Sequence, residues 1–358
     1  MVLLRSKTCF ALFFTILIMM LSLNPAAGLA QSGVKAVIDM AGRRVVLPSV
    51  INRVVGIGAG ALRLLVYLDA VEMVAGVEDI EQRGLTKPYL MAHPELAKLP
   101  SIGPAHGGDP ELIVARKPDV IFWTYTNAGY ADSLQRRTGI PVVVLNYGDL
   151  ANQKATFFKA LHLIAEVLNK QARADKLIAY IEAAIQDLER RTNRVPNTEK
   201  VYVGGVAHRG SHGITSTEPL YAPFMYVKAT NVGSGIGLEH AYIDKEQLIQ
   251  WNPDKIFIDS SGYNQVVNEL APGSVLAETL KAVKNNELYM VLPYNYYTTN
   301  FETVLANAYY VGKVLYPDQF KDIDPAKTAD RIYGFFVGKG VYSDMQKLYG
   351  GFRKLKLR

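Results

Sequence analysis

Short apolar runs alternate with longer segments of helical periodicity along most of this chain. Near-continuous apolar runs bounded by Gly, Pro or Asp are typical of strands that are buried on both faces. Such runs occupy residues 53–57, 73–77, 119–123, 142–145, 201–203, 255–258 and 288–291. Strands that alternate with helices indicate parallel sheets covered by helices, so the pattern predicts an α/β protein with two lobes and parallel-rich central sheets.

The most helical part of the chain separates the two sets of strands. Apolar residues recur every three or four positions from Phe157 to Leu168, and again from Leu177 to Leu188. The second repeat predicts a helix over about residues 170–193, which would reach roughly 36 Å at 1.5 Å per residue. We therefore expect an N-terminal lobe over residues 31–169, one long connecting helix over 170–194, and a C-terminal lobe with C-terminal helices over 195–358.

Residues 1–30 have the composition of a secretory signal peptide. Arg5 and Lys7 precede a run of 15 residues without charge, which is shorter than the roughly 20 that a membrane-spanning helix needs. The small residues Gly28 and Ala30 precede an expected cleavage before Gln31. The sequence thus predicts an exported protein, most simply in the periplasm of a Gram-negative cell.

Composition narrows the classes of function. The chain has 39 Lys and Arg against 33 Asp and Glu, and the excess is spread along it, which argues against a nucleic-acid binder. The one cysteine, Cys9, lies in the expected signal peptide, so the mature chain has no thiolate for a disulfide, metal site or nucleophile. No nucleophile elbow, Walker loop or His-Glu-x-x-His motif occurs. We predict a monomeric binding protein without a cofactor rather than an enzyme; the remote alternative is an exported metal-dependent hydrolase.

One segment of the sequence occurs twice. Residues 109–122 align without gaps to residues 244–257, with six identities in fourteen positions at an offset of 135. Both copies predict an acidic helix start, a short helix, a Pro-Asp turn and a buried strand. We interpret the repeat as the duplication of a lobe. The basic C-terminus, residues 353–358, we expect to be a solvated tail.

The whole expected mature chain resembles ABC-transporter substrate-binding proteins of the ferric-siderophore and cobalamin class. The resemblance rests on the opening segment (Asp39-Met-Ala-Gly42-Arg43 and Val45-Val-Leu-Pro48), on the repeated Glu-x6-Pro-Asp motif and on the single long helix between the lobes. It implies a ligand cleft between the lobes and delivery to an inner-membrane permease dimer driven by a cytoplasmic ATPase. It also implies that Glu111 and Glu246, one per lobe, dock onto that permease. As an alternative, each glutamate could simply favour the dipole of its helix start.

Ligands of parallel α/β sheets lie beyond the carboxyl ends of the strands, and loops there carry the candidate residues. The loop at residues 58–60 could offer backbone amides to an anion or be only a tight turn. A loop histidine or arginine can donate to an anion, and a tyrosine offers a flat face with a polar tip. At least one tyrosine of residues 294–297 should belong to the core, and the strand-end aspartate could instead cap a turn. The ligand-binding candidates are Gly58, Ala59, Gly60, His106, Tyr125, His208, Arg209, His212, Ser216, Asp259, Tyr294, Tyr296 and Tyr297.

The strongest candidate segment is residues 204–217, where two histidines and an arginine lie among glycines after a strand. Cationic donors with tyrosine faces favour an anionic, partly flat ligand, so an iron(III)-siderophore or related metal chelate is the leading hypothesis. A molybdate or tungstate oxyanion is the alternative within the same class, and it would use the amides of residues 58–60. A receptor for bare zinc or manganese would want three or four converging ligands, whereas this set is richer in Tyr and Arg.

Overall fold

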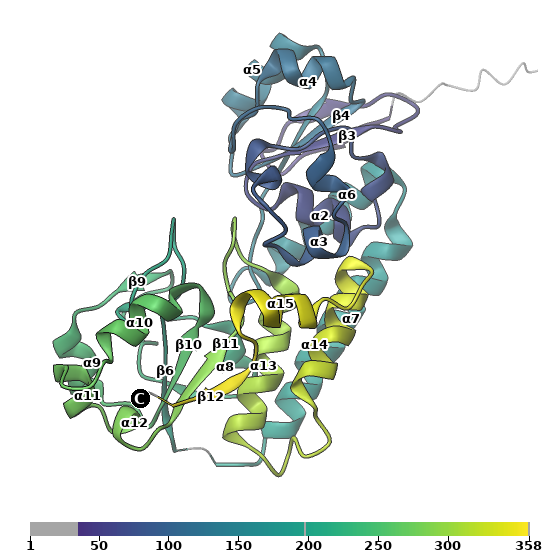
Figure 1. Cartoon of the computed structure of the whole chain (residues 1–358). Coiled ribbons are helices and arrows are strands. Elements are labelled where there is room, and N and C mark those ends of the chain that lie inside the picture. The colour runs from purple at the N-terminus through teal and green to yellow at the C-terminus, as the bar shows by residue number, and fades with distance from the viewer. Residues whose placement is uncertain (1–34, 197, 357–358) are drawn as a thin grey trace, which may run out of the picture. The chain divides into compact units, whose positions relative to one another are not determined.

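The computed structural model describes residues 35–196 and 198–356, drawn in colour in Figure 1. The expected signal peptide at residues 1–30 lies outside the described residues. No helix in the described part of the chain is long and apolar enough to cross a membrane.

The first lobe contains a parallel sheet with strand order β3-β4-β5. Its strands β3 (Val54–Ile57), β4 (Val120–Thr124) and β5 (Val142–Leu145) are buried throughout, as their apolar runs predict. A short hairpin, β1 (Ala36–Ile38) and β2 (Arg44–Val46), precedes them. The expected strand at residues 73–77 is wrong: this segment makes only isolated bridges, Val54 with Val74 and Val77 with Ser101. Gly76 interrupts it, because it packs so closely on Pro100 that a side chain there would lie 2.8 Å from the Pro100 carbonyl oxygen.

Helices cover both faces of this sheet. Figure 1 shows α4 and α5 on one side of β3 and β4, with α2, α3 and α6 on the other. The two faces form separate apolar clusters, because successive strand residues point to opposite sides. The elements of this lobe besides the strands are α2 (Ala61–Tyr67), η1 (Val71–Met73), η2 (Asp79–Gln82), α3 (Pro88–Ala92), η3 (Leu96–Lys98), α4 (Pro110–Arg116), α5 (Ala128–Thr138) and α6 (Lys154–Leu168).

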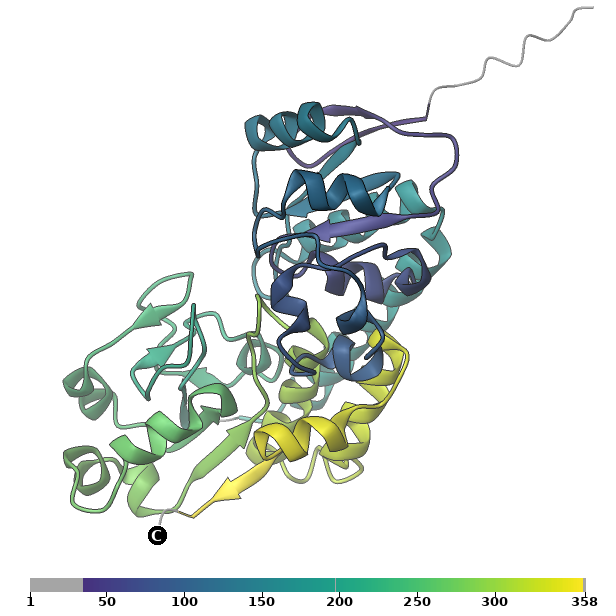
Figure 2. The same cartoon turned by 45° about the horizontal axis from the view of Figure 1, so that its top comes forward.

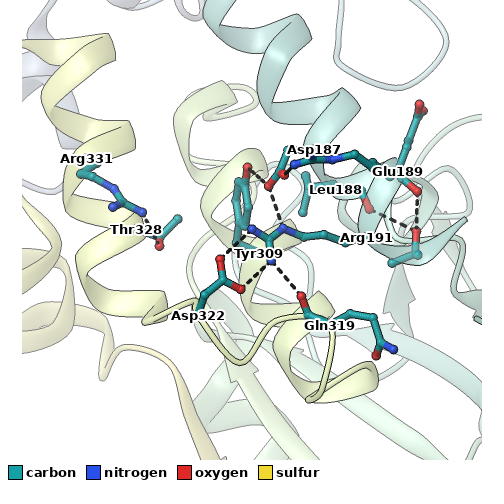
Figure 3. Close-up of polar contacts among 11 residues, drawn as sticks. Asp187, Leu188, Glu189, Arg191, Tyr309, Gln319, Asp322, Thr328 and Arg331 are labelled. Atoms are coloured by element: carbon teal, nitrogen blue, oxygen red, sulfur yellow. Dashed lines mark hydrogen bonds and ion pairs between the residues drawn. The ribbon is translucent and has the colours of Figure 1, made fainter.

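The long helix α7 (Gln171–Thr192) follows α6, close to its predicted range. It buries the apolar face that its periodicity indicates, including Leu177, Ile181 and Leu188. Near its carboxyl end, Arg191 forms ion pairs with Asp187 at 2.8 Å and with Asp322 at 2.7 Å, as Figure 3 shows. Tyr309 donates to Asp187 at 3.1 Å from the neighbouring helix α13 (Phe301–Leu315). These contacts fix α7 against the second lobe's helices.

The second lobe contains a mixed sheet with strand order β12-β11-β10-β6-β8. Strands β6 (Lys200–Gly204), β8 (Thr230–Asn231), β10 (Lys255–Asp259) and β11 (Leu288–Val291) are parallel. The expected solvated tail is wrong for residues 353–355, which form β12 (Arg353–Leu355) antiparallel to β11 (Figure 2). Leu355 is buried in the core, and the Lys354 ammonium donates to Glu287 at 2.5 Å. The burial of Leu355, which lies between two lysines, therefore favours the pairing of this segment with β11.

Short elements surround this sheet in the second lobe. Two strands, β7 (Ser216–Thr217) and β9 (Ala241–Tyr242), form an antiparallel pair outside the main sheet. The helical elements are α8 (Ala222–Tyr226), α9 (Lys245–Trp251), η4 (Ser260–Gly262), α10 (Tyr263–Glu269), α11 (Val275–Thr279), α12 (Lys281–Lys284), α14 (Pro325–Val337) and α15 (Tyr342–Tyr349).

The two copies of the sequence repeat fold alike. Asp109 caps α4 by accepting from the Glu111 and Leu112 amides, and Asp244 caps α9 by accepting from the Gln247 amide. After each helix, the aspartate of the Pro-Asp turn accepts a backbone N–H at the start of the neighbouring strand. Asp119 accepts from Arg53 at 2.8 Å, and Asp254 accepts from Lys200 at 2.6 Å.

Candidate functional site

The residues after β11 form a loop, residues 294–300, that we call the tyrosine loop. Its base is closed by two hydrogen bonds: the Tyr294 amide donates to Asp259 at 2.7 Å and the Asn300 amide donates to the Tyr294 carbonyl at 2.9 Å. At its tip, Tyr297 and Thr298 have φ values of 51° and 69°, a left-handed conformation that favours glycine. Strained residues of this kind are held by surrounding contacts and gather at functional sites.

Arg63 of α2 fixes the tyrosine loop to the first lobe. Its guanidinium is fully buried and donates to the carbonyl oxygens of Tyr296 at 2.8 Å and Thr299 at 2.9 Å. It also donates to the Asn300 side chain at 2.7 Å and to the Tyr147 hydroxyl at 2.5 Å. A buried arginine with these bonds holds the loop backbone in one position, because moving the loop would leave buried donors unpaired.

The tip of the tyrosine loop contacts a buried carboxylate of the first lobe. The Tyr297 hydroxyl donates to Oε2 of Glu78 at 2.8 Å, and the Gly58 amide donates to the same oxygen at 3.1 Å. The His106 amide in turn donates to the Tyr297 hydroxyl at 3.3 Å. Burial raises the pKa of Glu78 to about 7, and the nearby Glu81 charge adds to the rise, while the hydrogen bonds from Tyr297 and Gly58 oppose it.

The glycines at residues 58–60 are required by close packing. A side chain at Gly58 would lie 2.5 Å from the Thr124 carbonyl oxygen, and one at Gly60 would lie 2.2 Å from the Tyr147 ring. Both glycines have positive φ, and Ala59 between them is buried. Since the Gly58 amide already bonds Glu78, the anion that it binds in this structure is the protein's own carboxylate.

Tyr125 lies at the exposed end of this region, whereas Trp123 before it belongs to the core. The Tyr125 side chain is 62% exposed, and its hydroxyl lies 2.8 Å from the Thr298 hydroxyl of the tyrosine loop. Its ring stacks on Tyr147 with centroids 6.1 Å apart. Of the first-lobe candidates, Tyr125 therefore offers an exposed aromatic surface.

Four of the second-lobe candidates, His208, Arg209, His212 and Ser216, lie in residues 204–217, a segment that we call the histidine loop. His208 and Arg209 are exposed, and the guanidinium of Arg209 makes no hydrogen bond or ion pair with any residue in the described ranges. The loop adjoins the tyrosine loop, because the Asn295 side chain donates to the Ala207 carbonyl at 3.0 Å. The structure thus brings the histidine loop, the tyrosine loop and the Glu78 region into one connected set.

Besides Glu78 and Arg63, two residues of the second lobe escaped the sequence analysis. The pairing of β7 with β9 brings His240 and Tyr242 against the histidine loop, although they lie more than twenty positions away. The His240 ring stacks on His208 with centroids 4.3 Å apart, and the Tyr242 hydroxyl lies 2.9 Å from Nε2 of His212. Only the alternation of residues 240–243 could have indicated a strand here, and it is too short to predict pairing.

The pKa values of His240 and His208 are both lowered. Burial and the neighbouring rings of His208 and His212 lower the pKa of His240 to about 4. Burial, the Arg209 charge and His212 lower the pKa of His208 as well. Arg209 therefore carries a permanent positive charge next to the His208 ring.

Three of the predicted ligand contacts are buried, and their side chains contact other residues of the protein. Asp259 is fully buried and accepts from the Ser261 and Tyr294 amides, which is the capping role left open by the sequence. Tyr294 is 4% exposed and packs on Tyr221. Ser216 is buried and bonds the Val206 carbonyl and His240. Each was placed by its strand end, which does not reveal which side chain turns inward.

The remaining candidates, Tyr296, Glu111 and Glu246, could contact a ligand or partner or have a structural role. Tyr296 is half-buried, and the Lys87 ammonium lies 5.1 Å from its ring centroid. Part of its ring therefore contacts the first lobe. Glu111 and Glu246 are exposed in the first turns of α4 and α9. That position is compatible with contact to a partner and with a role at the helix start alike.

Comparison with known proteins places this geometry in a family. A family model described as periplasmic binding protein matches residues 57–293, well over half of the chain. The chain belongs to this family. The molybdate-binding protein MolA of Haemophilus influenzae is 25% identical over 324 residues, which cover 84% of this chain and 90% of MolA.

Solved periplasmic binding proteins share the two-lobe fold. The structure of Haemophilus influenzae MolA bound to molybdate matches with a TM-score of 0.67 at 23% identity, covering 86% of this chain and 98% of MolA. The TroA-like protein FepB of Veillonella parvula matches with a TM-score of 0.63 at 21% identity, over 85% and 97% of the chains. Helicobacter pylori CeuE with bound Ni(II) gives a TM-score of 0.63 at 16% identity, over 88% and 99%. This periplasmic binding protein therefore has the two-lobe fold of these solved binding proteins.

Proposed function

We propose that this periplasmic binding protein captures an anionic metal chelate, with an iron(III)-siderophore as the leading example. It delivers the chelate to an inner-membrane ABC importer and has no catalytic turnover of its own. The ligand would lie between the lobes, over residues 31–169 and 195–358, and the protein would act in the periplasm as a monomer.

The observation that carries the proposal is Arg209 on the histidine loop. Its guanidinium is exposed and without a partner among the described residues, and it follows His208, whose pKa its charge helps to lower. A guanidinium pairs with carboxylates and catecholates through two parallel hydrogen bonds. The exposed rings of Tyr125 and Tyr242 add flat apolar surface for the body of a chelator.

The distribution of possible metal-ligating side chains also favours a metal that is already bound to a chelator. In the parts of the chain that the structure describes, no three His, Cys, Asp or Glu side chains gather as a set that could hold a metal ion. A bare divalent cation would need such a set. A chelator supplies those ligands itself, so the protein has only to bind the outer surface of the complex.

A molybdate or tungstate oxyanion is the second candidate, and a specific observation favours it. The relative that is 25% identical over most of this chain is a molybdate-binding protein. Arg209 would serve an oxyanion equally well. An oxyanion would leave Tyr125 and Tyr242 without a role, and it would have to share the Gly58 amide with Glu78.

Native mass spectrometry of the protein prepared from the periplasm of its host separates these candidates. The proposal expects a bound species whose mass exceeds that of the protein by an iron-chelator complex, lost on unfolding. A mass increment of one molybdate or tungstate would replace the chelate proposal with the second candidate. Incubation with ester and phosphoester substrates serves as the control for turnover, and product formation would contradict the receptor role.

A further inference from the structure

Glu78 occupies a cradle of hydrogen-bond donors that the proposed function does not use. The Gly58 amide and the Tyr297 hydroxyl donate to Oε2 at 3.1 Å and 2.8 Å, and the His106 amide donates to that hydroxyl at 3.3 Å. The two donors to Glu78 come from distant parts of the sequence, one in the first lobe and one on the tyrosine loop. Converging N–H and O–H groups of this kind are what proteins use to hold a free oxyanion.

The cradle is closed around the carboxylate. Glu78 is 2% exposed, and the glycine that donates to it has no room for a side chain, because Thr124 lies behind it. A tetrahedral oxyanion would need the same Gly58 and Tyr297 donors. It would also be repelled by the Glu78 charge at close range whenever that carboxyl is ionised.

The two carboxyl oxygens of Glu78 differ in their hydrogen bonds. Oε1 is buried and has no hydrogen-bond partner in the described ranges. A buried carboxylate oxygen favours an N–H or O–H donor, since buried acceptors are normally paired.

We propose that Glu78 is a selectivity residue: it fills the first lobe's donor cradle with the protein's own carboxylate, and so rejects bare oxyanions. This inference rests on the proposed function and specifies its ligand class. Arg209 on the second lobe then binds the anionic part of the chelate.

The test is a gain of function in Glu78→Ala. Isothermal calorimetry with sodium molybdate, sodium sulfate and a ferric tris-catecholate bearing amide groups would be run on wild type, Glu78→Ala and Glu72→Ala, an exposed matched control. Glu78→Ala frees the donors, so its affinity for molybdate and sulfate should rise by about tenfold or more, while Glu72→Ala matches wild type. Glu78→Ala with no gain over wild type for either oxyanion would overturn the inference.

A second variant keeps the test decisive if Glu78→Ala does not fold, as judged by circular dichroism. Glu78→Gln keeps the side-chain volume and removes the charge, so a smaller gain for both oxyanions is expected, and its absence counts against Glu78. If wild type binds the ferric chelate but neither variant gains oxyanion affinity, only the role of Glu78 fails. If wild type binds neither probe and the variants gain molybdate, the role of Glu78 holds while the proposed ligand fails. Tight molybdate binding by wild type would overturn both.

Discussion

The Tyr297 hydroxyl donates a 2.8 Å hydrogen bond to Glu78, which lies 219 positions earlier in the sequence. This contact joins the tip of a second-lobe loop to a buried carboxylate of the first lobe. Arg63 holds the same loop by its backbone. A ligand that reached Glu78 would therefore have to form its contacts beside a loop that the protein already holds in place.

The raised pKa of Glu78 predicts a pH-dependent stability. Its pKa is about 7 in the folded protein against an ordinary value of 4.5, so the folded state binds the proton more tightly. The corresponding stabilisation is present below about pH 4.5 and is lost as the pH rises through about 7. Glu78→Gln removes this loss, so its free energy of unfolding relative to wild type should increase from pH 5 to pH 8, by up to roughly 3 kcal/mol.

Urea unfolding across that pH range measures the effect, with the exposed Glu72→Gln as the matched control. A difference between Glu78→Gln and wild type that stays constant with pH, or that falls as the pH rises, would contradict the assignment of a raised pKa to Glu78.

Tyr125 and Tyr294 should respond to truncation in opposite ways. Tyr294→Ala removes a buried ring, so it should lower the free energy of unfolding by about 3–5 kcal/mol, as for other large core aromatics. Tyr125→Ala removes an exposed ring and should leave stability nearly unchanged while weakening binding of a ferric chelate. Thermal unfolding and calorimetry on the two variants decide this, and a loss of stability in Tyr125→Ala as large as in Tyr294→Ala would refute the division.

The architecture followed from the sequence because strands buried on both faces produce continuous apolar runs. The duplicated Asp-x-Glu and Pro-Asp pattern also located both helix caps, at Asp109 and Asp244. The run at residues 73–77 misled, because an apolar run shows that a segment is buried but does not show that it pairs along its length.

The site was harder to predict, because its decisive contacts join segments that are far apart in the sequence. Strand ends indicated the histidine and tyrosine loops, but they could not show that Asp259 and Tyr294 turn inward. Glu78 and His240 carry no local signal, since each gains its role only when a distant loop or strand packs against it. Arg63 could have drawn attention as a lone charge inside an otherwise apolar helix.

The docking proposal predicts a separation of transport from binding. Glu111→Ala and Glu246→Ala change exposed residues on α4 and α9, so ligand affinity should be unchanged while uptake through the importer falls. Two separated charges fix the orientation on a two-fold permease, and the double variant should be more impaired than either single one. Uptake by reconstituted importer, with Glu95→Ala as an exposed control, measures this. Weaker ligand binding in either variant would place that glutamate in the binding site instead.

Arg209 is the residue on which the proposed function depends most directly. Calorimetric titration of a ferric tris-catecholate into wild type, Arg209→Ala and the exposed control Arg136→Ala measures its contribution. The account predicts tight binding by wild type and by Arg136→Ala, and about 10- to 100-fold weaker binding by Arg209→Ala, because a hydrogen bond to a charged group contributes about 1.5–3 kcal/mol. Equal affinity in all three proteins, or binding of molybdate with none of the ferric chelate, would contradict it.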